Sequence, residues 1–254
     1  MKIIGIDPAP SKDTVIYDGR KFRIIKVKNL KRFISCMEKL YEDIFICWDA
    51  PLSAATSKGC FNLYERNIEK FFNRQTKKNK SFTIPQGIST LGYAGCPHWT
   101  ISQYIFGYPV LNYEFTKPLK YTLVSSQSDI ANKGLYITET HPALSMWIWA
   151  KNSHIIKSWL YKHNSKKVDQ RVEMIQNIIE DLETRLDIRI PKDEILLDTK
   201  HMSDKLDAYI CWLLGKKLFE FNNKVKIYGD SLNGSFLLPF DDDIHNEMIQ
   251  SFKK

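Results

Sequence analysis

One pattern, repeated three times, limits most strongly what this chain can fold into. In each copy a short run of apolar residues ends in an acidic residue, and a proline follows within the next three positions. The acids that end the three runs are Asp7, Asp49 and Glu139. Apolar runs without alternation are typical of strands buried on both faces of a parallel or mixed sheet. Because proline cannot donate to the hydrogen-bond ladder, each strand is expected to stop at its acid.

The three acids are expected to lie together. A charged group at the end of a buried strand is costly unless a partner meets it. Parallel strands bring their carboxyl ends to one edge of a sheet, and sites in open α/β sheets lie at that edge. We therefore predict that the three strands lie side by side, with the strand that ends at Asp7 in the middle and the three carboxylates at one edge.

A fourth acid is expected to join them from a helix predicted over residues 203–221. At about 100° per residue, Asp207 lies among Ile210, Cys211 and other apolar residues of that helix. An acid on an apolar face is rare without a partner, and a buried salt bridge is the alternative interpretation. Asp204 lies at the border of the same face, where it can instead interact with the helix dipole after an N-cap at residue 203.

His141 follows the third acid by two positions and precedes a proline. It is a candidate for supporting the acids or for transferring protons. The alternative is that it is an ordinary residue at the start of a helix.

The rest of the chain alternates between strand and helix patterns. Strands are predicted at 14–17, 22–27, 226–228 and 235–238, and helices at 30–41, 62–75, 98–106, 142–149 and 168–186. Residues 52–134 are dense in Gly, Pro and aromatic residues between two core strands, which favours an insertion or lid over the site and not an independent domain. The acidic run 241–243 is interpreted as a solvated tail.

Composition restricts the function classes further. The formal charge of +8 favours anionic partners, nucleic acid first, although solvated basic faces produce the same surplus. Neither a signal peptide nor a run of about 18 apolar residues is present, so we expect a cytoplasmic protein without a membrane span. The sequence also contains no Gly-x-Ser-x-Gly motif, no Walker loop and no Gly-rich dinucleotide fingerprint.

The acids lie in stretches that resemble a known family. Residues 4–8 resemble the opening strand of RuvC-type and other RNase-H-like nucleases. Residues 48–52, 139–142 and 204–208 match in order a widespread domain-of-unknown-function family of predicted RNase-H-like nucleases, and residues 233–239 resemble its usual ending. The resemblance implies one α/β domain over 1–254, with an RNase-H-like mixed five-stranded sheet flanked by helices, a large insertion and a C-terminal β-hairpin.

These observations lead to one main functional expectation and two alternatives. Clustered carboxylates are the ligands that Mg²⁺ or Mn²⁺ takes, and such ions can activate a water against a phosphodiester. We expect a divalent-metal-dependent nuclease or phosphodiesterase. Its metal ligands would be Asp7, Asp49, Glu139 and Asp207, with Asp204 as a further ligand and His141 beside them. The alternatives are a nucleic-acid-binding module with little or no catalysis and an actin-like phosphotransferase, for which residues 8–11 are a poor phosphate turn.

Overall fold

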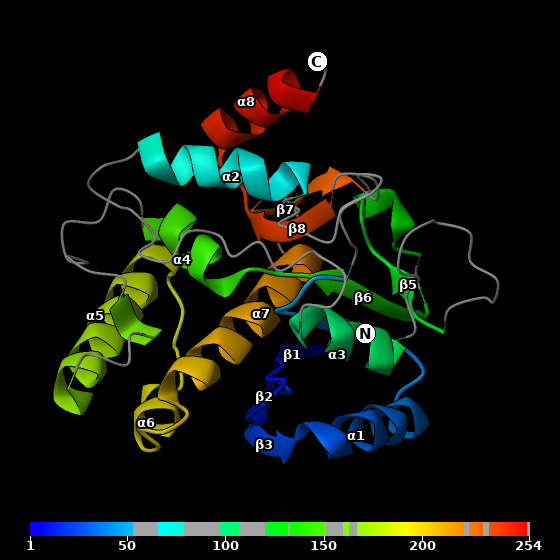
Figure 1. Ribbon diagram of the computed structural model, residues 1–254, viewed down its shortest axis with the longest axis vertical. Coiled ribbons are helices and arrows are strands. Elements are labelled where there is room, and N and C mark those ends of the chain that lie inside the picture. Colours follow the sequence, from blue (N-terminus) through cyan, green and yellow to red (C-terminus); the bar gives the residue numbers. More distant parts are fainter. Residues whose placement is uncertain are drawn as a thin grey trace.

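A six-stranded mixed sheet with helices on both faces forms the centre of the protein (Figure 1). The computed structural model describes residues 1–52, 66–78, 97–106, 120–131, 133–150, 160–162, 167–220, 224–230 and 234–252. The strands of the sheet, in spatial order, are β3 (Phe22–Lys26), β2 (Asp13–Tyr17), β1 (Lys2–Asp7), β4 (Ile44–Trp48), β6 (Leu135–Glu139) and β5 (Thr122–Leu123). A separate hairpin consists of β7 (Val225–Asp230) and β8 (Gly234–Pro239).

The three strands that end in acids are neighbours and run parallel, as predicted. Their order differs from the prediction, because β4, which precedes Asp49, lies in the middle, and β1 lies to one side of it. The predicted number of five strands is also wrong. A two-residue strand, β5, adds a sixth at the edge beside β6, and it is too short to produce a sequence pattern of its own.

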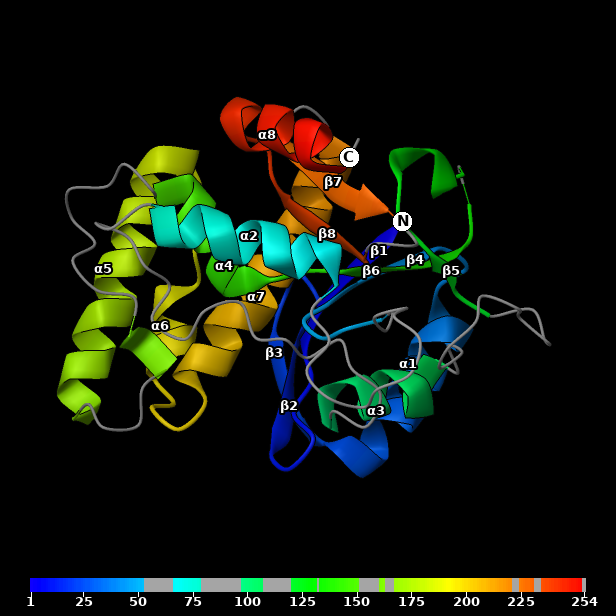
Figure 2. The same ribbon diagram turned by 45° about the horizontal axis from the view of Figure 1, so that its top comes forward.

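Helices cover the two faces of the sheet differently (Figure 2). On one face, α1 (Val27–Leu40) and α3 (Pro97–Phe106) pack over apolar side chains of β1, β4 and β6. Helix α1 does so through Leu30, Ile34 and Met37, which share one side of the helix. On the other face lie α4 (Pro142–Ala150), α5 (Val168–Leu186) and α7 (Met202–Glu220), which form the larger core. The short helix α6 (Lys192–Leu196) connects α5 to α7.

Helix α7 crosses the sheet in direct contact with β1. A Cβ atom at Gly5 would lie 2.1 Å from the carbonyl oxygen of Ala208, so only glycine allows this approach. The helix runs antiparallel to β1, because Gly215 near its end contacts Ile3 near the start of that strand. The first turns of α7 therefore lie over the carboxyl edge of the sheet.

Two details at helix ends differ from the prediction. Helix α7 begins at Met202, so residue 203 is inside the helix and is not its N-cap. The run 241–243 is not a solvated tail, because it starts helix α8 (Asp242–Phe252). The carboxylate of Asp241 accepts a hydrogen bond of 3.0 Å from the backbone N–H of Ile244, and two further acids occupy the first turn of the helix, where its dipole favours them.

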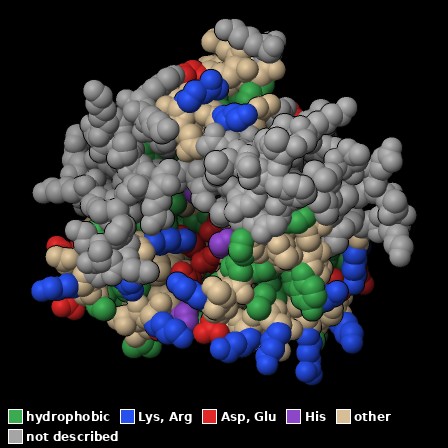
Figure 3. All heavy atoms as spheres, in the orientation of Figure 1, with side chains coloured by type: hydrophobic (Ala, Val, Ile, Leu, Met, Phe, Trp, Pro, Cys, Tyr) green, Lys and Arg blue, Asp and Glu red, His purple; other side chains and the backbone are tan. Residues whose placement is uncertain are grey.

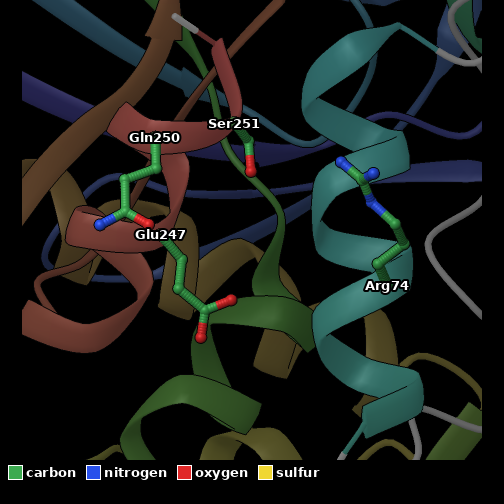
Figure 4. Close-up of a pocket in the computed structure, with 4 residues that line it drawn as sticks. All are labelled: Arg74, Glu247, Gln250 and Ser251. Carbon is green, nitrogen blue, oxygen red and sulfur yellow. The ribbon is translucent and has the colours of Figure 1, made fainter. Parts of the chain in front are cut away.

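The described parts of the predicted insertion contribute to both the sheet and the C-terminal hairpin. Strand β5 pairs with β6, and α2 (Asn67–Lys78) packs against β8 and α8. Beside this contact, a pocket of about 250 Å³ lies between α2 and α8 and is lined by Arg74, Glu247, Gln250 and Ser251 (Figure 4). Residues 53–65, 79–96 and 107–119 lie outside the described residues, so the proposed lid stays a prediction.

No helix in the described part of the chain is long and apolar enough to cross a membrane.

Candidate functional site

Three of the predicted acids meet at the carboxyl edge of the sheet. The strand ends are in register there, because the N–H of Asp49 donates to the carbonyl of Ile6 at 3.0 Å and the N–H of Thr140 donates to that of Trp48 at 2.9 Å. Side chains alternate along a strand, so Asp7 and Asp49 share the face of Gly5, which contacts α7. Asp207 is on α7 and fully buried. Two strand ends and one helix thus place their carboxylates at the same edge of the sheet, near enough for their charges to raise one another's pKa values.

Asp204 lies one turn before Asp207 and is half-buried. Its carboxylate accepts a hydrogen bond of 3.3 Å from the hydroxyl of Ser203. We refer to Asp7, Asp49, Asp204 and Asp207 as the acidic cluster. In Figure 3 acidic side chains gather in a recess near the centre of the visible face.

The pKa values of the cluster show that its members interact. Burial raises the pKa of Asp7 well above its ordinary value, and the carboxylates of Asp49 and Asp207 raise it further against the opposing effect of Lys162. Burial also raises the pKa of Asp49 to about 8, again opposed by Lys162 and supported by Asp207. Like charges in a poorly hydrated site favour the protonated form, and a cation that joins the carboxylates opposes this effect.

A lysine already supplies one positive charge. Lys162, in the short 3-10 helix Leu160–Lys162, forms an ion pair with the carboxylate of Asp207. The hydroxyl of the buried Tyr161 donates a hydrogen bond of 2.8 Å to the other oxygen of the same carboxylate. Burial favours the neutral amine, but Asp207, with help from Tyr161, Asp7 and Asp49, raises the pKa of Lys162 well above its ordinary value. Tyr161 and Lys162 lie in no periodic segment, so no sequence pattern could have identified this pair.

Glu139 is bound by partners outside the acidic cluster. It shares a register row with Trp48 and Ile6, one residue before Asp49 and Asp7. Its charge still contributes to the raised pKa of Asp49. Its two carboxylate oxygens accept hydrogen bonds of 2.8 Å and 2.5 Å from the guanidinium of Arg66, and the N–H of Leu52 donates a third at 3.0 Å. The structure therefore does not bring Glu139 to the acidic cluster as a free carboxylate.

Arg66 joins two segments that are distant in sequence. Besides Glu139 it binds Glu69, at 2.8 Å, and the side chains of all three residues are almost completely buried. Its guanidinium also lies 5.5 Å from the centre of the Phe236 ring on β8. Sequence reasoning missed Arg66, because one arginine inside the helix predicted over 62–75 carries no signal of its own.

His141 is neutral and hydrogen-bonded at the start of α4. Burial lowers its pKa to about 4, and the positive charges of Lys162 and Arg66 act in the same direction. The N–H of Leu144 donates to its Nδ1 at 3.3 Å, and this hydrogen bond assigns the proton of the neutral ring to Nε2. The ring is thus a hydrogen-bond donor near pH 7 and a poor base.

The donor chemistry of the cluster fits a hard divalent cation, since carboxylate oxygens are the ligands such ions take. The present arrangement is not a ready-made site. Among the residues that the structure describes, no three His, Cys, Asp or Glu side chains form a group that could hold a metal ion. Lys162 and Tyr161 occupy the oxygens of Asp207, so a cation would have to replace the ammonium group.

Comparisons of the chain with protein-family models, with curated proteins and with solved structures gave no match.

Proposed function

We propose that this chain is a divalent-metal-dependent nuclease or related phosphodiesterase with an RNase-H-like fold. The observation that carries the proposal is the convergence of Asp7, Asp49 and Asp207 at the carboxyl edge of the sheet, where their pKa values are raised. Such a concentration of carboxylates is costly in a protein that never binds a cation there. The return of β4 beside β1, after a hairpin and a helix, is the opening expected of the RNase-H-like fold.

The side chains of the site have separate roles in this proposal. Asp7, Asp49 and Asp207 would hold Mg²⁺ or Mn²⁺, and Asp204 lies close enough to add charge. The bound cation supplies an activated water and stabilisation of the leaving oxygen. Lys162, once separated from Asp207, offers an ammonium group to a phosphate oxygen. The Nε2–H of His141 is a second donor of this kind.

Glu139 has a positioning role in the proposal. By binding both Arg66 and the N–H of Leu52, it holds the segment after Asp49 and the start of α2 against the end of β6. This role replaces the metal-ligand role that its sequence pattern suggests.

One observation favours a second candidate, a nucleic-acid-binding module without catalysis. Lys162 already neutralises Asp207, so the cluster has an internal counterion and does not depend on a metal for burial of that acid. The two candidates differ in whether metal promotes cleavage.

The proposal predicts that Asp7→Asn removes metal-dependent cleavage and leaves the fold intact. Asparagine has nearly the same shape but is a weaker ligand for hard cations, so the variant should lose activity without losing stability. The measurement is cleavage of single- and double-stranded DNA and RNA oligonucleotides with Mg²⁺, with Mn²⁺ and with a chelator. Glu38→Gln is the control, because Glu38 pairs with the exposed Lys120 outside the cluster.

Wild-type and control cleavage should depend on the metal, and Asp7→Asn should fall to background. Cleavage that persists in the chelator, or in Asp7→Asn, contradicts the proposal. Metal-independent binding without cleavage by any variant favours the binding module.

A further inference from the structure

A group of lysines lies beside the acidic cluster on the side of β2 and β3. Lys26 and Lys200 each approach the carboxylate of Asp13 to 3.4 Å, from β3 and from the residue pair that precedes α7. Lys12 and Lys28 are exposed neighbours of Asp13 and Lys26 in the chain. We call Lys12, Lys26, Lys28 and Lys200 the basic cluster. The carboxylate of Asp13 thus faces the ammonium groups of two lysines directly, and the other two lysines are close in sequence.

Strand geometry places this group at the same edge as the acids. Strand β2 runs antiparallel to β1 with Asp7 opposite Val15, so Asp13 lies beyond the end of β1 on the carboxyl side. Lys26 is opposite Asp13 in the β2–β3 pairing. In Figure 3 Lys and Arg side chains border the lower side of the acidic recess, with a histidine among them.

Asp13 at the centre of the basic cluster is held by a buried contact, and the lysines around it are exposed to solvent. His201 lies 3.5 Å from Asp13 through Nε2 and 2.7 Å from Asp198 through Nδ1, which ties the start of α7 to β2. The side chains of Lys26 and Lys200 are 71% and 74% exposed, so their charges face solvent and can bind an anion. Surface pairs of this kind contribute little to stability, and Asp13 leaves a surplus of positive charge.

The distance between the two clusters matches a nucleic-acid strand. Lys200 lies two residues before α7, and Asp207 lies in the second turn of that helix, about 7.5 Å from its start at a rise of about 1.5 Å per residue. A strand that rises about 3.4 Å per stacked nucleotide can therefore place one phosphate at Lys200 and another, a few nucleotides away, at the acidic cluster.

We propose that the basic cluster binds the backbone of a nucleic-acid strand a few nucleotides from the reacting phosphate, an inference that rests on the proposed function. The strand crosses the ends of β3 and β2, and then reaches Asp7 and Asp49. Phosphate contacts position a strand without reading its sequence, so this surface fixes register and not base preference. It also sets a minimum length, because a dinucleotide cannot reach both clusters.

The test is equilibrium binding of labelled DNA and RNA oligonucleotides in a chelator, where no metal-dependent cleavage occurs. The variant is Lys26→Gln/Lys200→Gln, and the control is Lys192→Gln/Lys216→Gln, which removes two lysines that pair with Glu180 and Glu220 elsewhere on the surface. Affinity is measured over a series of salt concentrations for a single-stranded octanucleotide and for a dinucleotide. Thermal melting establishes that each variant is folded.

Removal of two phosphate contacts should reduce the slope of log K against log salt by about 1.4 for a single strand and weaken binding on the order of tenfold near 0.1 M salt. The control should keep the wild-type slope, and the dinucleotide should show a smaller slope and a smaller difference between wild type and variant than the octanucleotide. If the variant and the control show equal slopes of log K against log salt, the inference is wrong. It is also wrong if the wild type does not bind the octanucleotide. Because metal is absent, this failure is separate from failure of the nuclease proposal, which cleavage with Mn²⁺ tests.

Discussion

Arg66→Met is expected to destabilise the folded protein by about 3–5 kcal/mol, because it leaves two buried carboxylates without their cation. The side chains of Arg66, Glu69 and Glu139 are almost completely buried, so water cannot replace the lost hydrogen bonds. Methionine retains the length of the apolar stem and removes only the charge and donors. The measurement is the free energy of unfolding from urea denaturation at neutral pH.

The loss should be smaller at acidic pH. Burial raises the pKa of Glu139, and Arg66 is the main opposing influence, so removal of Arg66 raises the pKa in the folded state further. A carboxyl with a raised folded-state pKa stabilises the fold at low pH and loses that contribution as the pH rises. Adding Glu139→Gln to Arg66→Met should restore part of the stability.

Lys192→Met is the matched control, because the ion pair of Lys192 with Glu180 is on the surface and should contribute less than about 1 kcal/mol. If Arg66→Met destabilises no more than this control, the buried ion cluster does not hold the segments together.

Lys162→Met is expected to have the second-largest effect on the free energy of unfolding, and this effect should depend on whether metal is present. Without metal, the buried Asp207 loses its ion pair while Tyr161 still donates one hydrogen bond. Lys162 is more than one third exposed, so the loss should be about 1–3 kcal/mol and not the full cost of a buried pair. Asp207→Asn in the same chain should recover much of this loss, because the uncompensated charge is then absent.

Mn²⁺ should stabilise Lys162→Met more than it stabilises the wild type. The ammonium group of Lys162 competes with a cation for Asp207, so the variant should bind Mn²⁺ more tightly and gain more stability from it. Ligand linkage gives about 2.7 kcal/mol at a hundred times the dissociation constant. Thermal melting of wild type, Lys162→Met and the exposed control Lys167→Met, each with and without Mn²⁺, measures this difference. An equal or smaller Mn²⁺ shift in Lys162→Met contradicts competition between the two cations.

The sheet edge could be predicted from sequence because strand ends leave a local signal. Asp7 and Asp49 each terminate a buried run, and Asp207 interrupts an apolar helix face, so the pattern predicts that all three face one edge of the sheet. Their charges raise one another's pKa values in the structure. The order of the strands was not accessible, because apolar runs of similar length do not specify which strand is central.

The position of Glu139 shows the limit of this reasoning. Side chains alternate along a strand, so a difference of one residue in register moves a side chain to the opposite face. Glu139 pairs with Trp48 and not with Asp49, and nothing in the sequence fixes that register. Its partner Arg66 lies in a predicted helix and the counterion Lys162 in no predicted element, and in both cases only tertiary contacts determine which charges meet.

The most direct test of the central claim is the position of Mn²⁺ in crystals soaked with it, located by anomalous diffraction. The account predicts an anomalous peak within coordination distance of carboxylate oxygens of Asp7, Asp49 and Asp207, with Lys162 displaced from Asp207 and Glu139 still bound to Arg66. Absence of a peak at this cluster, with Lys162 still paired to Asp207 at millimolar Mn²⁺, would contradict the assignment of these acids as a metal site.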